Sequence, residues 1–275
     1  MALSLKKNDI VWTTPNTYAA SANCVLNCGA KIDFVDIDNE TWNISIPGLE
    51  KKLIQAKKKK KLPKAVIPVH FAGQPTDQEK IKKLSKKYNF KIIEDASHSI
   101  GAKNHNEPVG SCKWSDITVF SFHPVKIITT GEGGAVLTND KKYAELIKLY
   151  RENGINFKKQ SFKKKPYYPK YYEQIKTGYN YRMSDISAAL GISQIKKIKN
   201  FIKQRNKIAN TYKSYLKNTP IKFQKVLNKI YSSYHLFVIQ LPKKDLKIKY
   251  EDIFKIFRKK GINVDLHYKA LHLNP

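Results

Sequence analysis

Residues 92–140 read IIEDASHSIGAKNHNEPVGSCKWSDITVFSFHPVKIITTGEGGAVLTND, and this stretch decides both the fold and the chemistry of the chain. One apolar run ends in an acid, Asp95, and a second ends at Ser121. Lys126 follows five residues later, before the glycine-rich turn 131–134. Short apolar runs bounded by turn residues are typical of buried strands. We therefore expect a lysine, a carboxylate and a hydroxyl at one edge of a sheet.

Strand-like and helix-like segments alternate on both sides of this stretch. Runs rich in Val, Ile and Phe predict strands at 9–13, 31–37, 65–71, 90–94, 117–122 and 135–138. Helical patterns lie between them at 18–27, 47–59, 79–88 and 141–152. Residues 76–79 have the capping-box spacing that starts the third helix. Several strands are apolar on both faces, as in a parallel sheet covered by helices, so we predict an α/β domain with ligands at the carboxyl ends of its strands.

The pattern changes after residue 156. Residues 157–172, FKKQSFKKKPYYPKYY, are basic and aromatic, and fit either a solvated insertion or a flap over an anionic substrate. Further elements are predicted as a long helical stretch at 184–216, a strand at 236–241, a helix at 250–260 and a strand at 262–267. The expected parts are a large α/β domain (1–183), a linking helical region (184–216) and a small C-terminal domain (217–275).

The charge balance is strongly basic. The 275 residues include 52 Lys and Arg against 22 Asp and Glu, a formal net charge of +30. Such an excess raises the alternative of a nucleic-acid-binding protein. Most lysines are scattered on predicted helices and turns, as in 57–61 and 82–87, so solvated helix faces are the preferred explanation.

Targeting and metal signals are not visible in the sequence. The start, MALSLKKNDIVW, lacks the apolar stretch of a signal peptide, and no run approaches the length of a membrane span. Cys24, Cys28 and Cys112 form no CxxC pair. We interpret Cys24 and Cys28 as small buried hydrophobic residues, expect no metal, and expect a reducing cytoplasm.

The three polar groups of the opening stretch are those that pyridoxal phosphate (PLP) chemistry needs. The Lys126 amine can bond covalently to the cofactor aldehyde. The Asp95 carboxylate can keep the pyridine nitrogen protonated, so that the ring withdraws electrons. The Ser121 hydroxyl, together with nearby backbone N–H groups, can hold the phosphate.

The chain resembles the DegT/StrS family of PLP-dependent nucleotide-sugar aminotransferases over essentially all of its length. The resemblance is carried, in order, by WTTPNTYAASANCVLNCGAKIDFVDID, PVHFAG, EDASHSIGA, SDITVFSFHPVK, TTGEGGAVLTND, GYNYRMSDISAALG and GINVDLHY. Within the family, the sequence of these motifs is most similar to that of the aminotransferases of pseudaminic acid biosynthesis. The resemblance implies the type I fold of aspartate aminotransferase, with an α/β/α large domain and a small C-terminal α+β domain.

The resemblance also implies roles for residues around the cofactor. Lys126 matches the lysine that bonds to PLP, and Asp95 matches the partner of the pyridine nitrogen. His98 stands where the family contacts the ring face or its phenolic oxygen, with a structural histidine as the alternative. Ser121 matches the phosphate-binding serine. Tyr18 stands where an aromatic residue stacks on the ring, although core packing explains it nearly as well.

Other matched residues concern the substrate and a second subunit. Asn180 matches an asparagine that reaches the phosphate of the neighbouring subunit, which implies a homodimer with shared sites. Arg182 is expected to meet a substrate carboxylate or phosphate, with ordinary structural pairing as the alternative. His267 and Tyr268 match a pair that lines the substrate side.

The implied reaction is ping-pong transamination with Lys126 as the base. Glutamate donates the amino group and leaves as 2-oxoglutarate, and C4 of a UDP-linked 4-keto-6-deoxy-N-acetylhexose accepts it; the sequence does not fix the exact sugar. Family members begin with a further segment and continue beyond the equivalent of 267–268, so we expect an internal piece of a longer enzyme. An inactive or fragmentary homologue is therefore a further alternative.

Overall fold

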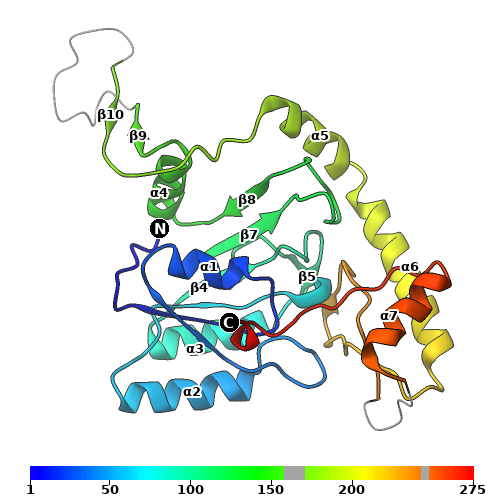
Figure 1. Ribbon diagram of the computed structural model, residues 1–275. Coiled ribbons are helices and arrows are strands. Elements are labelled where there is room, and N and C mark those ends of the chain that lie inside the picture. Colours follow the sequence, from blue (N-terminus) through cyan, green and yellow to red (C-terminus); the bar gives the residue numbers. More distant parts are fainter. Residues whose placement is uncertain (158–170, 243–247) are drawn as a thin grey trace.

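The computed structural model describes residues 1–157, 171–242 and 248–275 (Figure 1). At its centre lies a six-stranded sheet with the strand order β2-β1-β3-β4-β7-β8. The strands are β1 (Ile10–Thr13), β2 (Lys31–Phe34), β3 (Ala65–Ile67), β4 (Lys91–Asp95), β7 (Ile117–Ser121) and β8 (Gly134–Leu137). Neighbouring strands pair in parallel, except that β8 runs antiparallel to β7. A fully parallel sheet is therefore wrong at this edge, because the loop between β7 and β8 contains no crossover helix.

Helices cover both faces of the sheet, as predicted. They are α1 (Ala20–Leu26), α2 (Ile46–Lys58), α3 (Gln78–Tyr88) and α4 (Lys141–Arg151). Neighbouring residues of β1 point to opposite faces, so Trp12 packs with Leu49 of α2 and Ile81 of α3, whereas Val11 packs with Val25 of α1. The two apolar cores fix the strands, and with them the positions of the strand ends.

The helix starts differ in one detail from the prediction. Ser45 caps α2, and Asp77 caps α3 by accepting a hydrogen bond from the backbone N–H of Lys80. The capping box predicted over 76–79 is wrong, because α3 begins one residue later than that pattern requires. Within the described residues, the buried hydroxyl of Thr76 has no hydrogen-bond partner.

The C-terminal third is less regular than predicted. The helical stretch at 184–216 is two helices, α5 (Asp185–Ile195) and α6 (Ile198–Leu216), which are separated at 196–197. The helix α7 (Tyr250–Lys259) is confirmed. The strand predicted at 236–241 is reduced to β13 (Ile239–Gln240), which pairs with β11 (Lys222–Phe223).

No strand forms over 262–267, a described segment that crosses back from α7 toward the sheet (Figure 1). Instead of pairing with a strand, the chain that follows makes single hydrogen bonds near residue 16. The backbone N–H of Leu271 donates to the Pro15 carbonyl oxygen at 2.9 Å, and that of Tyr268 donates to Asn16 Oδ1 at 3.1 Å. Sequence patterns for a strand were misleading here because no neighbouring strand offers a ladder.

The remaining elements are short. They are β5 (Lys103–Asn104), β6 (Glu107–Pro108), β9 (Ile155–Asn156), β10 (Glu173–Gln174), β12 (Ile230–Tyr231), η1 (Phe71–Gly73) and η3 (Leu271–Leu273). Most of the basic, aromatic stretch 157–172 lies outside the described residues. Cys24 is exposed, so its prediction as a buried residue is wrong, because that side of α1 faces solvent. Across the described ranges, no helix has the length and apolar composition that a membrane crossing requires.

Candidate active site

The carboxyl ends of two neighbouring parallel strands bring the predicted site residues together. Asp95 is the last residue of β4, and Ser121 is the last residue of β7. The two strands pair in parallel, with Asp95 opposite Val119. Their carboxyl ends therefore meet at one edge of the sheet, where α/β proteins bind their ligands.

Lys126 lies in the loop that joins β7 to β8. Two backbone hydrogen bonds close this loop, from the N–H of Phe122 to the carbonyl oxygen of Gly133 (2.8 Å) and from the N–H of Thr130 to that of Phe122 (3.0 Å). Gly133 has φ +152, and a Cβ there would collide with Thr130 and Met183. Burial lowers the pKa of the Lys126 amine, and the charge of Asp95 partly opposes this. The amine is therefore neutral more often than that of an exposed lysine, and so more nucleophilic.

Asp95 is fixed by two hydrogen bonds, one from a distant part of the chain and one from its own turn. Ser21 Oγ donates to Oδ2 at 2.6 Å, and the backbone N–H of Ser97 donates to Oδ1 at 3.1 Å. The carboxylate is half-buried and interacts electrostatically with Lys126. The sequence interpretation missed Ser21, which looks like an ordinary first-turn serine of α1.

His98 forms a buried wall of the site. The backbone N–H of Ala72 donates to its Nδ1 at 3.3 Å, and its Nε2 lies 3.2 Å from the Tyr268 hydroxyl oxygen. Burial lowers the pKa of His98 to about 3, and electrostatic interactions with Lys126 and His267 lower it further. The imidazole is therefore neutral, with its proton on Nε2 and directed at Tyr268.

The late histidine–tyrosine pair also comes to this edge. Burial raises the pKa of Tyr268 to about 12, with smaller contributions from the charges of Asp95 and Tyr18. The Tyr268 ring lies 6.4 Å from that of Tyr18, and Tyr18 is 66% exposed. Tyr18 therefore does not pack in the core and is free to contact a ligand. His267 is half-buried next to this group and interacts electrostatically with His98.

His235 is a second histidine that the sequence interpretation missed. Its ring lies 4.5 Å from that of His98, and its Nδ1 is buried without a hydrogen-bond partner among the described residues. Burial lowers the pKa of His235 to about 2, and electrostatic interactions with His98 and Lys126 make smaller contributions in the same direction. Arg205 of α6 donates to its backbone carbonyl at 3.0 Å and so fixes this segment. No local sequence signal distinguished His235 from a core residue.

Asn180 and Arg182 are not brought to this group. Both side chains are exposed, and the backbone of Asn180 bridges that of Glu152 near the end of α4. In the described part of the chain, no hydrogen bond or ion pair joins either residue to Lys126 or Asp95. The structure therefore divides the predicted site residues into an assembled group and an exposed pair.

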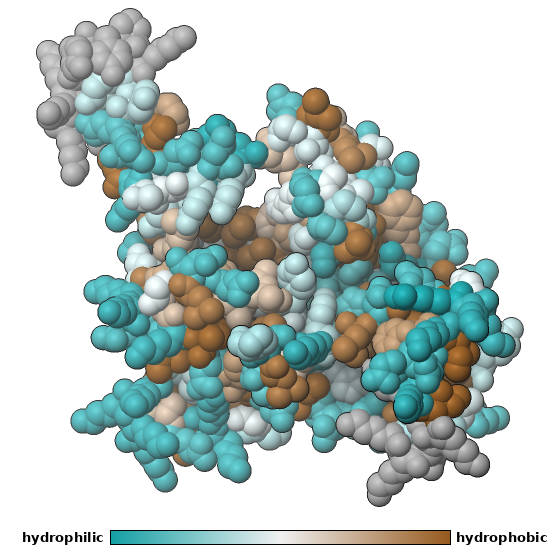
Figure 2. All heavy atoms as spheres, viewed as in Figure 1, coloured by the Kyte–Doolittle hydropathy of each residue, from teal (hydrophilic) through white to brown (hydrophobic). Residues whose placement is uncertain are grey.

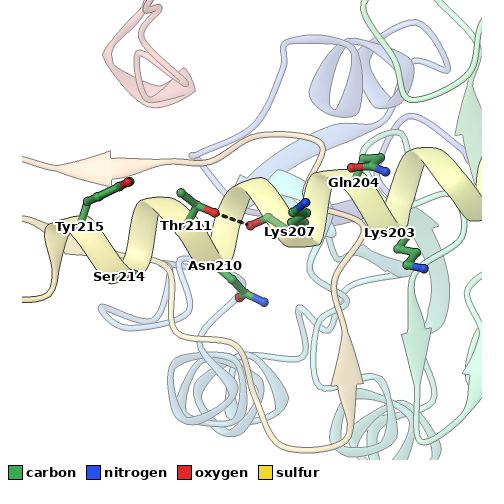
Figure 3. Close-up of a pocket in the computed structure, with 7 residues that line it drawn as sticks. All are labelled: Lys203, Gln204, Lys207, Asn210, Thr211, Ser214 and Tyr215. Atoms are coloured by element: carbon green, nitrogen blue, oxygen red, sulfur yellow. Dashed lines mark hydrogen bonds between the residues drawn. The ribbon is translucent and has the colours of Figure 1, made fainter.

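Two alternative sites would be a surface depression on α6 and a metal-binding cluster. A depression of about 780 Å³ lies along one face of α6 and contains none of the predicted site residues (Figure 3). Its lining is polar: Lys203, Gln204, Lys207, Asn210, Thr211, Ser214 and Tyr215. Within residues 1–157, 171–242 and 248–275, no cluster of three or more His, Cys, Asp or Glu residues could hold a metal ion.

The assembled group fits PLP by the chemistry of its donors. It offers a half-buried amine of lowered pKa, a fixed carboxylate and a half-buried strand-end hydroxyl, Ser121. An exposed aromatic ring and a neutral imidazole flank them. The amine matches the PLP aldehyde, the carboxylate matches the ring nitrogen and the hydroxyl matches the phosphate, while the aromatic ring and the imidazole match the faces of the ring.

Comparisons with known proteins agree with this chemistry. The profile of the DegT/DnrJ/EryC1/StrS aminotransferase family matches residues 1–275. The UDP-4-amino-4,6-dideoxy-N-acetyl-beta-L-altrosamine transaminase of Campylobacter jejuni is 41% identical over 264 residues, which cover 96% of this chain and 66% of that protein. The chain thus spans about two thirds of the length of this curated relative.

Solved structures give the same result. PseC of Helicobacter pylori, an aminotransferase involved in the biosynthesis of pseudaminic acid, superposes with a TM-score of 0.85 at 33% identity, over 99% of this chain and 71% of that one. A DegT DnrJ EryC1 StrS aminotransferase of Brucella abortus gives 0.84 at 26% identity, over 99% and 71%. The type I fold predicted from the sequence is confirmed.

Proposed function

Because the chain belongs to the DegT/DnrJ/EryC1/StrS aminotransferase family, we propose that it transfers an amino group from glutamate to C4 of a UDP-linked 4-keto-6-deoxy-N-acetylhexose. The family uses PLP. Similarity to the Campylobacter transaminase and to PseC supports a nucleotide-sugar substrate and a role in pseudaminic acid or related surface-sugar synthesis. The observation that carries the proposal is the half-buried amine of Lys126, whose pKa is lowered, within electrostatic reach of Asp95.

Each residue of the assembled group has a proposed place around PLP. Lys126 would bond to the aldehyde, Asp95 would face the ring nitrogen, and Ser121 would hold the phosphate. Tyr18 and His98 would contact the ring. When bound, PLP supplies an electron-withdrawing ring that stabilises negative charge on the α-carbon of an amino acid.

Lys126 is the proposed proton carrier. Once the incoming amino group has taken its place, the free amine is positioned to remove a proton from the α-carbon and to return one. Its lowered pKa favours the neutral form that this step needs. Asp95, held by Ser21 and Ser97, would keep its charge directed at the ring nitrogen throughout.

The residues behind the ring have a supporting task. Neutral His98 directs its Nε2 proton at the Tyr268 oxygen, which leaves the phenol proton available for a ligand. Tyr268 is a phenol at neutral pH, and burial raises its pKa further, to about 12. We assign His267 and Tyr268 to the substrate side, and Arg182 to a carboxylate or phosphate of the substrate.

A second subunit is part of the proposal. Helix α5 is apolar but has no buried residue, and Ile186, Ile192 and Ile195 are 86%, 59% and 53% exposed. Figure 2 shows hydrophobic surface on this helix and a hollow between it and α4. Exposed apolar area of this kind marks an interface. We propose that a second copy covers α5 and receives Asn180 at its cofactor phosphate.

The proposal is tested by locating the cofactor. One portion of the PLP-incubated protein would be reduced with borohydride, digested and mapped by mass spectrometry. A second, unreduced portion would be assayed for 2-oxoglutarate formation from glutamate. We expect a single pyridoxyl group on Lys126 and stoichiometric 2-oxoglutarate from the unreduced protein. Labelling scattered over surface lysines, without 2-oxoglutarate, would contradict the proposed function.

A further inference from the structure

The hydroxyl groups of Thr17 and Ser21 form a buried chain that ends on Asp95. Ser21 Oγ lies 2.6 Å from Asp95 Oδ2, and Thr17 Oγ1 lies 2.9 Å from Ser21 Oγ. Thr17 and Ser21 are only 2% and 5% exposed. Water therefore has little access to either hydroxyl, so both depend on partners within the protein for their hydrogen bonds.

The direction of this chain follows from the chemistry of its end. A carboxylate only accepts hydrogen bonds, so the single hydroxyl proton of Ser21 is donated to Asp95. The Ser21 oxygen is then left as the acceptor in its contact with Thr17, and Thr17 is the donor. Each donor polarises the next, which strengthens the final hydrogen bond to the carboxylate.

The second carboxylate oxygen is held independently. The backbone N–H of Ser97 donates to Oδ1 at 3.1 Å, while Ser21 occupies Oδ2. Donors on different oxygens fix the plane of the carboxylate. Each carboxylate oxygen has two lone pairs, so acceptor capacity remains for a further donor.

We propose that Ser21, supported by Thr17, is a positioning residue that holds Asp95 against the protonated ring nitrogen of PLP. This inference rests on the proposed function, since it requires PLP at Asp95. Ser21 does not touch the reacting atoms; it acts through the carboxylate. Without its proton donor, Asp95 loses one of its two fixed hydrogen bonds and rotates more freely, so the pairing with the ring N–H weakens.

The test measures the ring nitrogen directly. Holo-protein would be prepared with ¹⁵N-labelled PLP, and the ¹⁵N chemical shift of the ring followed against pH for the unaltered protein and for Ser21→Ala, Ser21→Thr and Thr17→Val. Asn23→Ala, an exposed position on the same helix, is the matched control. The dissociation constant for PLP and the thermal unfolding of the PLP-free protein would be measured in parallel.

We expect Ser21→Ala to lower the pH at which the ring nitrogen loses its proton by about one unit, which is tenfold in the protonation equilibrium. Thr17→Val should shift it in the same direction by less, Ser21→Thr should restore it, and Asn23→Ala should leave it unchanged. A merely structural serine would change thermal unfolding without moving the nitrogen signal. Should Ser21→Ala not fold, the comparison of Thr17→Val with Ser21→Thr decides.

Two outcomes separate this inference from the proposed function. If the unaltered protein binds PLP on Lys126 but the Ser21→Ala or Thr17→Val midpoint equals that of Asn23→Ala, the positioning role is overturned alone. If the unaltered protein yields no bound labelled PLP, the proposed function and the positioning role are overturned together.

Discussion

Two regions of the molecule differ in how many contacts a single subunit gives them. The first is the sheet edge with Asp95 and Lys126, and the second is the segment 173–195, which contains Asn180 and α5. At the sheet edge, hydrogen bonds hold two of the polar groups: Ser21 holds Asp95, and Ala72 and Tyr268 hold His98. In 173–195 the side chain of Asn180 is exposed, and α5 buries none of its residues. A single subunit thus assembles the proposed cofactor-binding group but leaves an apolar helix and a candidate phosphate ligand open to a partner.

The two regions nevertheless touch. A Cβ on Gly133, in the loop after Lys126, would collide with Met183, and one on Gly191 of α5 would meet Thr130. The loop that carries the lysine therefore lies against the exposed helix and the residue Met183 before it. A partner that covers α5 would also press on the lysine loop, which links assembly to the geometry of the pocket.

The largest expected effect lies at the assembled edge. Lys126→Ala should abolish both the cofactor absorbance and 2-oxoglutarate formation from glutamate, because this amine is the proposed covalent attachment point and proton carrier. Lys113→Ala is the matched control, since Lys113 is exposed and pairs with Glu107 at 2.7 Å. If the cofactor absorbance survived in Lys126→Ala, Lys126 would not be the attachment point, and the proposed role of the sheet edge would be contradicted.

Asp95→Asn should have the next largest effect. The change is close to isosteric, so we expect the fold to be kept while turnover falls on the order of a hundredfold, as expected for losing a charged hydrogen-bond partner of about 3 kcal/mol. Steady-state kinetics with glutamate, together with circular dichroism, measure the two parts. Unchanged turnover would mean that Asp95 is only structural.

Ile186→Glu should act on assembly rather than on the pocket. Loss of a buried isoleucine contact of about 1.5–3 kcal/mol should weaken the dimer roughly ten- to hundredfold. Sedimentation equilibrium over a concentration series measures this, with Ile54→Glu, a 45% exposed isoleucine on α2, as the control. A dimer that both variants leave equally strong would place the interface elsewhere.

The smallest effect on function is expected from His98, whose burial should appear in the pH dependence of stability. His98 has an ordinary pKa of 6.5 that burial lowers to about 3 in the folded protein, so the unfolded chain binds its proton more readily. This contribution is complete above pH 6.5 and is lost as the pH falls toward 3. Urea unfolding at several pH values gives the free energy of unfolding as a function of pH. Between pH 3 and 6.5, its slope against pH should be smaller in His98→Gln by up to about 1.4 kcal/mol per pH unit. Parallel pH curves for the two proteins would contradict the neutral, buried state of His98.

The sequence predicts the assembled edge well because its residues sit at strand ends. Asp95, Ser121 and Lys126 follow local apolar runs, and the pairing of β4 with β7 then brings them to one edge. Ser21 could not be found in this way, since it meets Asp95 across 74 positions and only the docking of α1 on the sheet brings them together. His235 was missed for the same reason.

Two predictions in the C-terminal third, one continuous helix over 184–216 and a strand at 262–267, failed for a related reason. Hydrophobic periodicity ran through 184–216, but it could not reveal the break between α5 and α6 at 196–197. A strand at 262–267 required a neighbour that the fold does not supply. The proposed domain boundaries at 183/184 and 216/217 and the cytoplasmic location remain predictions. Local sequence patterns predict individual helices and strands, whereas strand pairing and interfaces depend on distant parts of the chain or on a second subunit.

Subunit complementation tests most directly whether the two regions belong to one shared site. Lys126→Ala and Asn180→Ala proteins would be purified separately, each expected to be nearly inactive, and then mixed and allowed to exchange subunits. If each site uses Lys126 of one chain and Asn180 of the other, random mixing should restore about a quarter of the unaltered activity, because half of the dimers are hybrids with one intact site. Proven hybrid dimers with no recovered activity, or an Asn180→Ala monomer with full activity, would contradict the account.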